Sequence, residues 1–279
     1  MLQRAGAGGP PVVFLPGAGL IGLDFWNLQQ RAAAYTTAVV YDRGGTGWSD
    51  ATDLPRSAAA VATELRDLLA AAGLPGPYVL AGHSLGGVYA RRFAQMFPAD
   101  VAALLLLDPA HEDLLARVPA EAAALSAQLQ PDADSLPDLT AEQIAASRSA
   151  LDRLYAAWPP AIRDALIDRK LATWRTGMRE AANLETDVYA ELRAGGPLPQ
   201  VPLTVVTAMG ANPLWQGHAP ADLIERTQES IRALHADLAA SVPGGRHVVL
   251  PDAQHQLMHV QAEDEISATV RDLHDAASG

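Results

Sequence analysis

The stretch G-H-S-L-G-G at residues 82–87 constrains the fold of this chain more than any other feature. The apolar run at residues 78–81 before it predicts a buried strand, and residues 88–97 after it have a helical pattern. A serine between glycines at such a junction is typical of a nucleophile elbow, a sharp turn from strand to helix. Glycines at 82 and 86 leave room for the turn, because a Cβ at either position would crowd it. The pattern predicts that the Ser84 hydroxyl and the Leu85 N–H lie together at the end of a sheet.

Short apolar runs recur along the chain and alternate with helical patterns. The runs cover residues 12–15, 38–41, 78–81, 101–107, 202–207 and 246–250. Most of them are continuously apolar, which is typical of parallel strands covered by helices on both faces. We therefore predict an α/β fold with a mostly parallel central sheet of about six strands flanked by helices. Residues 1–10 are rich in glycine and are expected to be an irregular lead-in.

One part of the chain interrupts this alternation. Between residues 114 and 195 we find helical patterns at 121–129, 140–155, 160–175 and 177–192, and no strand pattern. The sequence G-G-P-L-P at 195–199 then predicts a linker back to the strands. We predict an α/β core formed by residues 1–112 and 196–279, with an all-helical insertion at residues 113–195.

Composition excludes several classes of function. The net charge of −12 disfavours nucleic acid and membrane surfaces as partners, because an acidic surface repels phosphate groups. The absence of cysteine excludes disulfides and thiolate nucleophiles. No segment reaches the roughly 18 apolar residues of a membrane helix, and the run at 12–15 is too short for a signal peptide. We expect a soluble, cytoplasmic protein, and the alanine-rich, lysine-poor usage is typical of a GC-rich bacterial genome. The oligomeric state stays open.

A serine nucleophile needs a base, and one of the eight histidines is placed to supply it. His255 follows the last predicted strand near the end of the chain, where an enzyme with the order Ser, Asp, His carries its base. His111 also follows a strand and is a lesser candidate, and His259 is expected to be a packing neighbour of the site. His255 and His259 lack the intervening glutamate of a zinc motif, so we expect no metal site and no cofactor.

The acid that orients the base is less well defined by the sequence. Asp108 directly follows the strand at 101–107, whereas the loop after 202–207 holds no carboxylate before Asp222. We favour Asp108 over Asn212 or a residue near Asp222. The reaction would also need two N–H groups for a developing oxyanion. We assign these to Leu85 in the elbow and to Ala18 in the P-G-A-G loop at 16–19.

Taken together, these motifs resemble the α/β-hydrolase superfamily over nearly the whole chain. G-H-S-L-G-G resembles its elbow, and D-R-G-G-T-G-W-S at 42–49 resembles the D-x-x-G-x-G-x-S segment that follows its fourth strand. L-P-G at 15–17 is similar to its oxyanion loop. Gln254-His255, followed by Glu263, is similar to the segment that carries its catalytic base. The first two strands of that fold are reduced or missing here, and the acid after the penultimate strand is absent. Some cap-bearing members carry the acid at the place of Asp108, and the insertion falls where the family has its cap, or lid.

The resemblance implies an esterase or lactonase. Ser84 would be the nucleophile, His255 the base and Asp108 the orienting acid, and the product would form through an acyl-serine intermediate without a cofactor. Two alternatives remain open. The same residues could serve an acyltransferase or cyclase, or the chain could be a ligand-binding protein that has lost turnover.

The expected substrate is a small, apolar ester or lactone. Tyr155, Trp158 and Trp174 lie in the predicted cap and, with Gly17 near the elbow, are expected to contact it. The alternative for the three aromatic side chains is that they pack the cap helices against one another.

Overall fold

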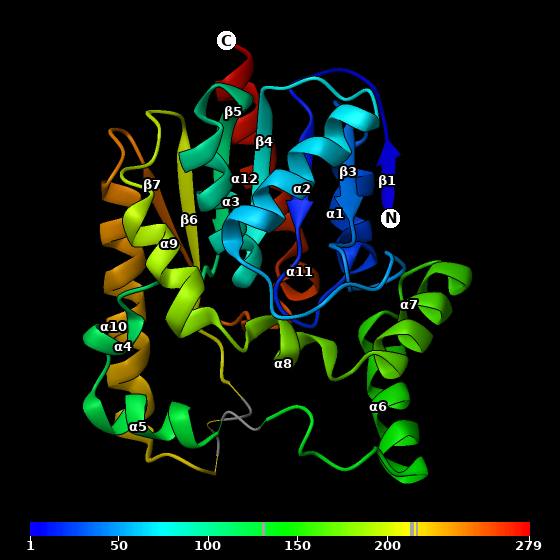
Figure 1. Cartoon of the computed structure of the whole chain (residues 1–279), viewed down its shortest axis with the longest axis vertical. Coiled ribbons are helices and arrows are strands. Elements are labelled where there is room, and N and C mark those ends of the chain that lie inside the picture. The colour runs from blue at the N-terminus through cyan, green and yellow to red at the C-terminus, as the bar shows by residue number, and fades with distance from the viewer. Residues whose placement is uncertain (130–131, 213–214, 216) are drawn as a thin grey trace.

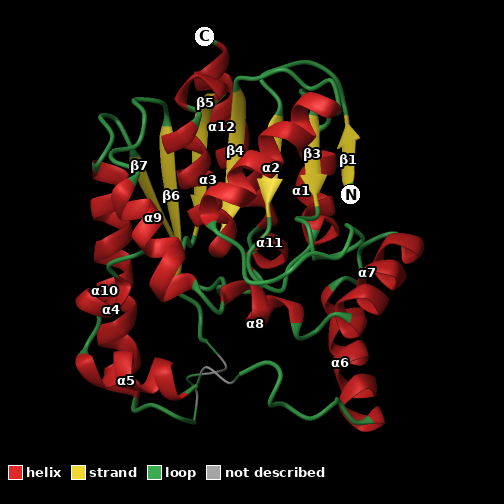
Figure 2. Ribbon diagram, viewed as in Figure 1, coloured by secondary structure: helices red, strands yellow, loops and turns green. Residues whose placement is uncertain are grey.

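Seven strands form a single sheet in the computed structural model, which describes residues 1–129, 132–212, 215 and 217–279. Their spatial order is β1-β3-β2-β4-β5-β6-β7 (Figure 2). The strands are β1 (Leu2–Ala5), β2 (Val12–Leu15), β3 (Ala38–Tyr41), β4 (Tyr78–His83), β5 (Val101–Leu107), β6 (Leu203–Ala208) and β7 (Arg246–Leu250). Strands β2 to β7 are parallel, and β1 is antiparallel to β3. This confirms the prediction of an α/β fold with a mostly parallel sheet.

The strand β1 corrects one expectation. Residues 1–10 were expected to be irregular, but Leu2 pairs with Tyr41 and Ala5 pairs with Ala38 at the edge of the sheet. Because β1 is an edge strand, its two central residues are exposed and it lacks the apolar run that marks the buried strands. The sheet therefore has one strand more than the six that the apolar runs predict.

Helices cover both faces of the sheet (Figure 1). One face carries α2 (Ala58–Ala71), α3 (Leu85–Met96), α9 (Tyr189–Ala194) and α10 (Ala221–Ala240). The other face carries α1 (Trp26–Ala32) and α12 (Glu263–Ser278). Alternate residues of a strand pack into the two apolar cores, one on each face of the sheet. In β2, for example, Val13 and Leu15 pack toward the first face and Val12 and Phe14 toward the second, and all four are fully buried.

In the residues that the structure describes, the segment between β5 and β6 consists of helices joined by loops and turns. It holds α4 (Leu114–Arg117), α5 (Ala120–Gln128), α6 (Ala141–Leu154), α7 (Pro160–Ala172), α8 (Thr176–Ala181), the π-helical turn η3 (Leu184–Val188) and α9. The single helix expected at 177–192 is thus three short segments. The break allows Glu180 of α8 to reach Arg43 while Val188 and Leu192 pack into the core of the first face.

Except for its last elements, η3 and α9, which pack on the first face of the sheet, this insertion lies beyond the carboxyl ends of the parallel strands (Figure 1). A third apolar cluster attaches it to the core, where Ile21 and Leu23 pack against Tyr155, Trp158, Leu166 and Ile167. Three short elements complete the fold, namely the 3₁₀ turns η1 (Gly22–Phe25) and η2 (Pro98–Asp100) and the helix α11 (Met258–Gln261). The loops that follow β2, β4, β5, β6 and β7 therefore begin on the side of the sheet that faces the insertion.

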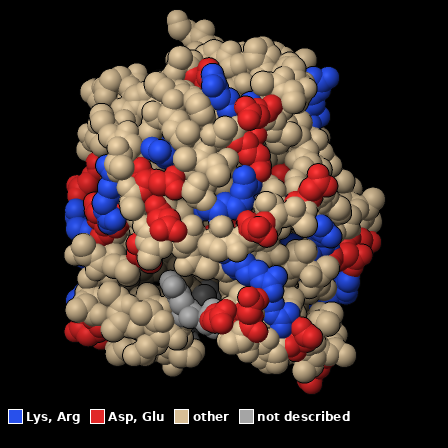
Figure 3. All heavy atoms as spheres, in the orientation of Figure 1, with Lys and Arg blue, Asp and Glu red and all other residues tan. Residues whose placement is uncertain are grey.

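Acidic and basic side chains are interspersed on the face of the molecule drawn in Figure 3. Many of the exposed ones form ion pairs, such as Arg179 with Asp134 at 2.6 Å. Each exposed pair contributes only about 0–1 kcal/mol to stability, since water screens the charges. Among the helices of the described residues, none has the length and apolar character needed to cross a membrane.

Candidate active site

Ser84 lies in a tight turn between β4 and α3. Its φ of 50° and ψ of −118° place it in a strained backbone region. The glycines on either side are required by close packing. A Cβ at Gly82 would lie 2.5 Å from the Gly86 carbonyl oxygen, and a Cβ at Gly86 would lie 2.0 Å from that of Leu15. The turn therefore depends on glycine at both positions, and it presses the start of α3 against the end of β2.

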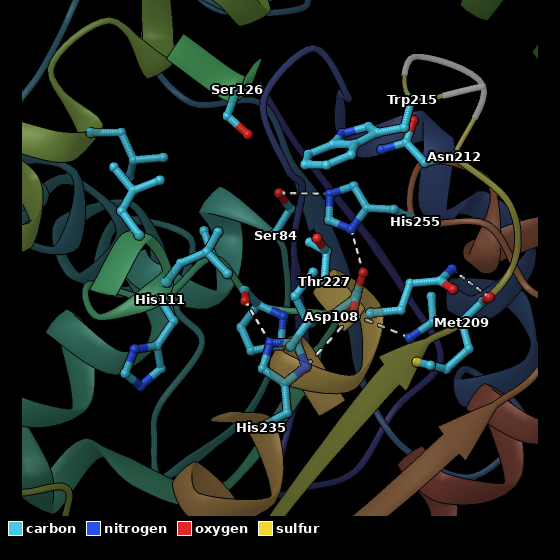
Figure 4. A pocket seen from close by; sticks show the side chains of 18 of the residues that line it. Ser84, Asp108, His111, Ser126, Met209, Asn212, Trp215, Thr227, His235 and His255 are labelled. Atoms are coloured by element: carbon cyan, nitrogen blue, oxygen red, sulfur yellow. Dashed lines mark hydrogen bonds and ion pairs between the residues drawn. The ribbon is translucent and has the colours of Figure 1, made fainter. Parts of the chain in front are cut away.

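Ser84, His255 and Asp108 form a hydrogen-bonded chain (Figure 4). Ser84 Oγ lies 3.0 Å from His255 Nε2, and His255 Nδ1 lies 2.5 Å from Asp108 Oδ2. Because a carboxylate only accepts hydrogen bonds, the imidazole proton is assigned to Nδ1 and leaves Nε2 free to accept from Ser84. The three residues follow β4, β7 and β5, so the parallel sheet brings them to one edge.

Asp108 is held in a defined orientation at the end of β5. Its backbone has a φ of 44°, and its Oδ1 accepts the N–H of Ala208 at 3.1 Å. Burial opposes ionisation of this carboxyl group, but the hydrogen bond to His255 and the nearby imidazoles outweigh it and lower the pKa of Asp108 below its ordinary value. Asp108 is therefore a carboxylate whose two oxygens both have a fixed partner.

His235 lies behind Asp108, although sequence patterns did not single it out. Its Nε2 lies 3.0 Å from the carbonyl oxygen of Pro109, and its Nδ1 lies 2.8 Å from Thr207 Oγ1. Burial lowers the pKa of His235, so the ring is neutral near pH 7. His235 lies in the middle of α10. A helical sequence pattern does not show which of its polar side chains will contact a site formed by other elements.

The other two histidines near the site have different surroundings. The ring of His111 points away from Ser84 (Figure 4), and its Nδ1 accepts the Asp113 N–H at 3.1 Å. Burial lowers the pKa of His111 to about 4. The ring of His83 packs against that of His255, with centroids 4.8 Å apart, and His83 Nε2 donates to the His255 carbonyl oxygen at 2.8 Å. His83 thus holds the backbone of the loop that carries His255.

The two N–H groups assigned by sequence to the oxyanion belong to the residue after Ser84 and to the residue after Gly17. Leu85 is the first residue of α3, and Ala18 is in the loop after β2. Within the part of the chain that the structure describes, neither backbone N–H donates to an acceptor. The loop touches the elbow directly, because a Cβ at Gly17 would lie 3.1 Å from Ser84 Cβ and 2.6 Å from His83 Nδ1.

A cavity of about 320 Å³ opens beside Ser84, Asp108 and His255. Trp215 lies close to His255 in this cavity (Figure 4), although no sequence motif points to it. The apolar lining comes from both the core and the insertion, and consists of Leu114, Leu115, Leu184, Tyr189, Met209, Trp215, Ile224 and Ile231. The polar lining includes Asn212 and the carboxylate of Glu185. The cavity suits a small, mainly apolar molecule.

The aromatic residues expected to contact a substrate do not line this cavity. The Tyr155 hydroxyl donates to the buried Asp24 at 2.6 Å, and Trp158 packs at a tilt against the rings of Tyr155 and Trp26. Trp174 lies under the guanidinium of Arg175 in a separate surface hollow. The physical reason is that the small helical insertion needs large apolar side chains for its own packing, as cluster formation by Tyr155 and Trp158 shows.

Metal-binding clusters were not expected. Among the residues that the structure describes, there is no group of three or more His, Asp or Glu side chains placed to hold a metal ion. His259, the candidate partner of His255 in a zinc motif, is fully buried against Phe25, and burial lowers its pKa to about 4.

Comparison with known proteins gives the chain its relatives. A family model described as "Alpha/beta hydrolase family" matches residues 12–269. Over 89 residues the chain is 41% identical to an uncharacterized protein of Schizosaccharomyces pombe, which covers 30% of this chain and 17% of that protein. Over 109 residues it is 29% identical to the uncharacterized protein YbdG of Bacillus subtilis, covering 38% of this chain and 34% of the relative. The chain therefore matches only 17% and 34% of the length of these two proteins.

Solved structures match over nearly the full chain. An esterase from Thermogutta terrifontis has a TM-score of 0.65 at 20% identity, and the match covers 99% of this chain and 93% of the esterase. An enol-lactonase from Burkholderia xenovorans has a TM-score of 0.64 at 20% identity, covering 98% of this chain and 95% of the lactonase. At this level of identity the similarity establishes the fold.

Proposed function

Because the chain belongs to the alpha/beta hydrolase family, we propose that it is a serine hydrolase that cleaves a carboxylic ester or lactone through an acyl-serine intermediate. The observation that carries the proposal is the hydrogen-bonded chain from Ser84 through His255 to Asp108. Ester and lactone cleavage are also the activities named for two structural neighbours, an esterase and an enol-lactonase.

The first half of the reaction would acylate Ser84. His255 Nε2 accepts the proton of the Ser84 hydroxyl while Oγ attacks the carbonyl carbon of the substrate. Asp108 stabilises the imidazolium that forms, and the N–H groups of Leu85 and Ala18 face the oxyanion. Each such donor contributes roughly 3 kcal/mol of transition-state stabilisation. The C–O bond to the leaving group then breaks, and His255 transfers its proton to the departing oxygen.

The second half would return the free enzyme. His255 removes a proton from water, and the hydroxide attacks the acyl carbon and forms a second tetrahedral intermediate. The bond to Ser84 Oγ breaks, Oγ recovers the proton from His255, and the carboxylic acid leaves. For a lactone substrate, the alcohol and acid are parts of one ring-opened product.

The apolar lining of the cavity supports a small substrate whose acyl or alcohol part is mainly apolar. A panel of p-nitrophenyl esters and lactones, assayed on the wild type and on Ser84→Ala, tests the proposal. We expect hydrolysis by the wild type and a loss of about 10⁵- to 10⁶-fold in kcat for Ser84→Ala. Retention of the activity by a correctly folded Ser84→Ala protein would show that Ser84 is not the nucleophile.

A further inference from the structure

Arg43 and Glu180 form a buried ion pair beside the loop that carries Ala18. Their side chains are 1% and 3% exposed, and Arg43 Nε and Nη2 donate to the two carboxylate oxygens of Glu180 at 2.7 and 3.0 Å. The guanidinium also donates to two backbone carbonyl oxygens of the loop, to Pro16 at 2.5 Å and to Gly17 at 3.1 Å. Arg43 is thus held on one side by a carboxylate and holds the loop on the other.

The hydrogen bond to Gly17 fixes the direction of the next N–H group. The peptide between Gly17 and Ala18 is trans, so its C=O and its N–H point in opposite directions. Since the Gly17 oxygen faces Arg43, the Ala18 N–H faces away from Arg43. In the described part of the chain this N–H has no acceptor.

Helix α8 supports the same loop from the insertion. Gly177 packs so closely that a Cβ there would lie 2.5 Å from the Gly19 nitrogen and 3.0 Å from the Ala18 carbonyl carbon. Glu180 follows one turn later on α8 and reaches Arg43. The residues that hold the loop therefore come from the core and from the insertion together.

We propose that Arg43, held by Glu180 of the insertion, is a positioning residue that orients the Ala18 N–H toward the oxyanion formed at Ser84. The inference rests on the proposed function. It implies that the oxyanion site is complete only when α8 is packed against the loop, because the core alone does not supply Glu180. The insertion then contributes to the chemical step as well as to the walls of the cavity.

A second ion pair in the same chain offers a matched control. Arg91 donates to the two oxygens of Glu112 at 2.7 Å each, and these side chains are 6% and 10% exposed. Arg91 makes no hydrogen bond to the loop at residues 16–19. The substitution of arginine by lysine keeps the charge at either site but removes the planar fork that binds several acceptors at once.

The test compares Arg43→Lys with Arg91→Lys. For Arg43→Lys we expect kcat on the best p-nitrophenyl ester to fall about 30-fold or more with KM changed by less than about twofold, because a misplaced group costs up to about 100-fold. For Arg91→Lys we expect a change of less than about threefold, although thermal unfolding should show a similar loss of stability in both variants.

Inhibitor binding separates a positioning role from a merely structural one. A trifluoromethyl ketone forms a tetrahedral oxyanion with the serine, whereas the matching methyl ketone binds without the adduct. In Arg43→Lys the affinity for the trifluoromethyl ketone should fall by the same factor as kcat/KM, and the affinity for the methyl ketone should stay unchanged. If Arg43→Lys does not fold, Glu180→Gln is compared with Glu112→Gln in the same way.

Two outcomes would overturn the inference. One is equal activity loss in Arg43→Lys and Arg91→Lys, and the other is an equal loss of affinity for both ketones. Either result, obtained with an active wild type, leaves the proposed function intact. A wild type that hydrolyses no ester or lactone would instead refute the proposed function itself.

Discussion

Replacing Asp108 by asparagine should lower kcat by about 10⁴-fold, which corresponds to about 5.5 kcal/mol in the activation free energy. The reason lies in the two partners of the carboxylate. Oδ1 accepts the Ala208 N–H at 3.1 Å, and Oδ2 accepts the His255 Nδ1–H at 2.5 Å. An asparagine must place its carbonyl oxygen opposite the Ala208 N–H, so its NH₂ group faces His255. The imidazole then carries its proton on Nε2, where it cannot accept the proton of Ser84.

The assay is steady-state hydrolysis of the best p-nitrophenyl ester by Asp108→Asn, with circular dichroism and thermal unfolding to establish that the variant is folded. Asp113→Asn is the control, because Asp113 lies in the same loop but its side chain is 54% exposed. We expect the control to keep full activity. A folded Asp108→Asn protein that loses less than about 100-fold would refute the role of Asp108 as the orienting acid.

Two further predictions concern pH and substrate charge. Burial lowers the pKa of His259 from its ordinary 6.5 to about 4. Between these two pH values the unfolded chain binds a proton at His259 that the folded protein does not bind. The free energy of unfolding therefore falls as the pH is lowered from 6.5 toward 4. In urea unfolding, His259→Phe should therefore remove about 3 kcal/mol of the fall in unfolding free energy across this range, and an unchanged pH dependence would contradict the burial argument. Esters with a terminal carboxylate should be hydrolysed at least about ten times more slowly than neutral isosteres. The reason is that the described cavity lining includes Glu185 but no lysine or arginine. Equal kcat/KM values for the two kinds of ester would contradict this.

The sequence could predict those parts of the fold whose signal is local. The central strands are buried on both faces, so each is a continuous apolar run, and Ser84 stands in a turn that only glycine-flanked residues can form. Asp108 could be proposed because side chains at the carboxyl ends of neighbouring parallel strands share one edge. The edge strand β1 was missed because half of it faces solvent and shows no apolar run.

Other parts of the site depend on contacts between distant segments. Arg43 belongs to a motif that the sequence makes visible, but its partner Glu180 is 137 residues away on a helix of the insertion. His235 is one of several polar residues of α10, and only the packing of that helix against β6 brings it beside Asp108. Trp158 was expected to contact the substrate but packs in the apolar cluster of the insertion. The sequence pattern of an aromatic residue in a helix is the same for packing and for binding.

The measurement that tests the central claim most directly is covalent labelling with an alkyl fluorophosphonate, followed by peptide mass spectrometry. The reagent forms a stable adduct with a serine that an adjacent base activates. We expect one adduct per chain, located on Ser84, with labelling abolished in Ser84→Ala and strongly slowed in a folded His255→Ala protein. Labelling at another residue, or a wild type that is not labelled, would contradict the claim that His255 activates Ser84 as the nucleophile.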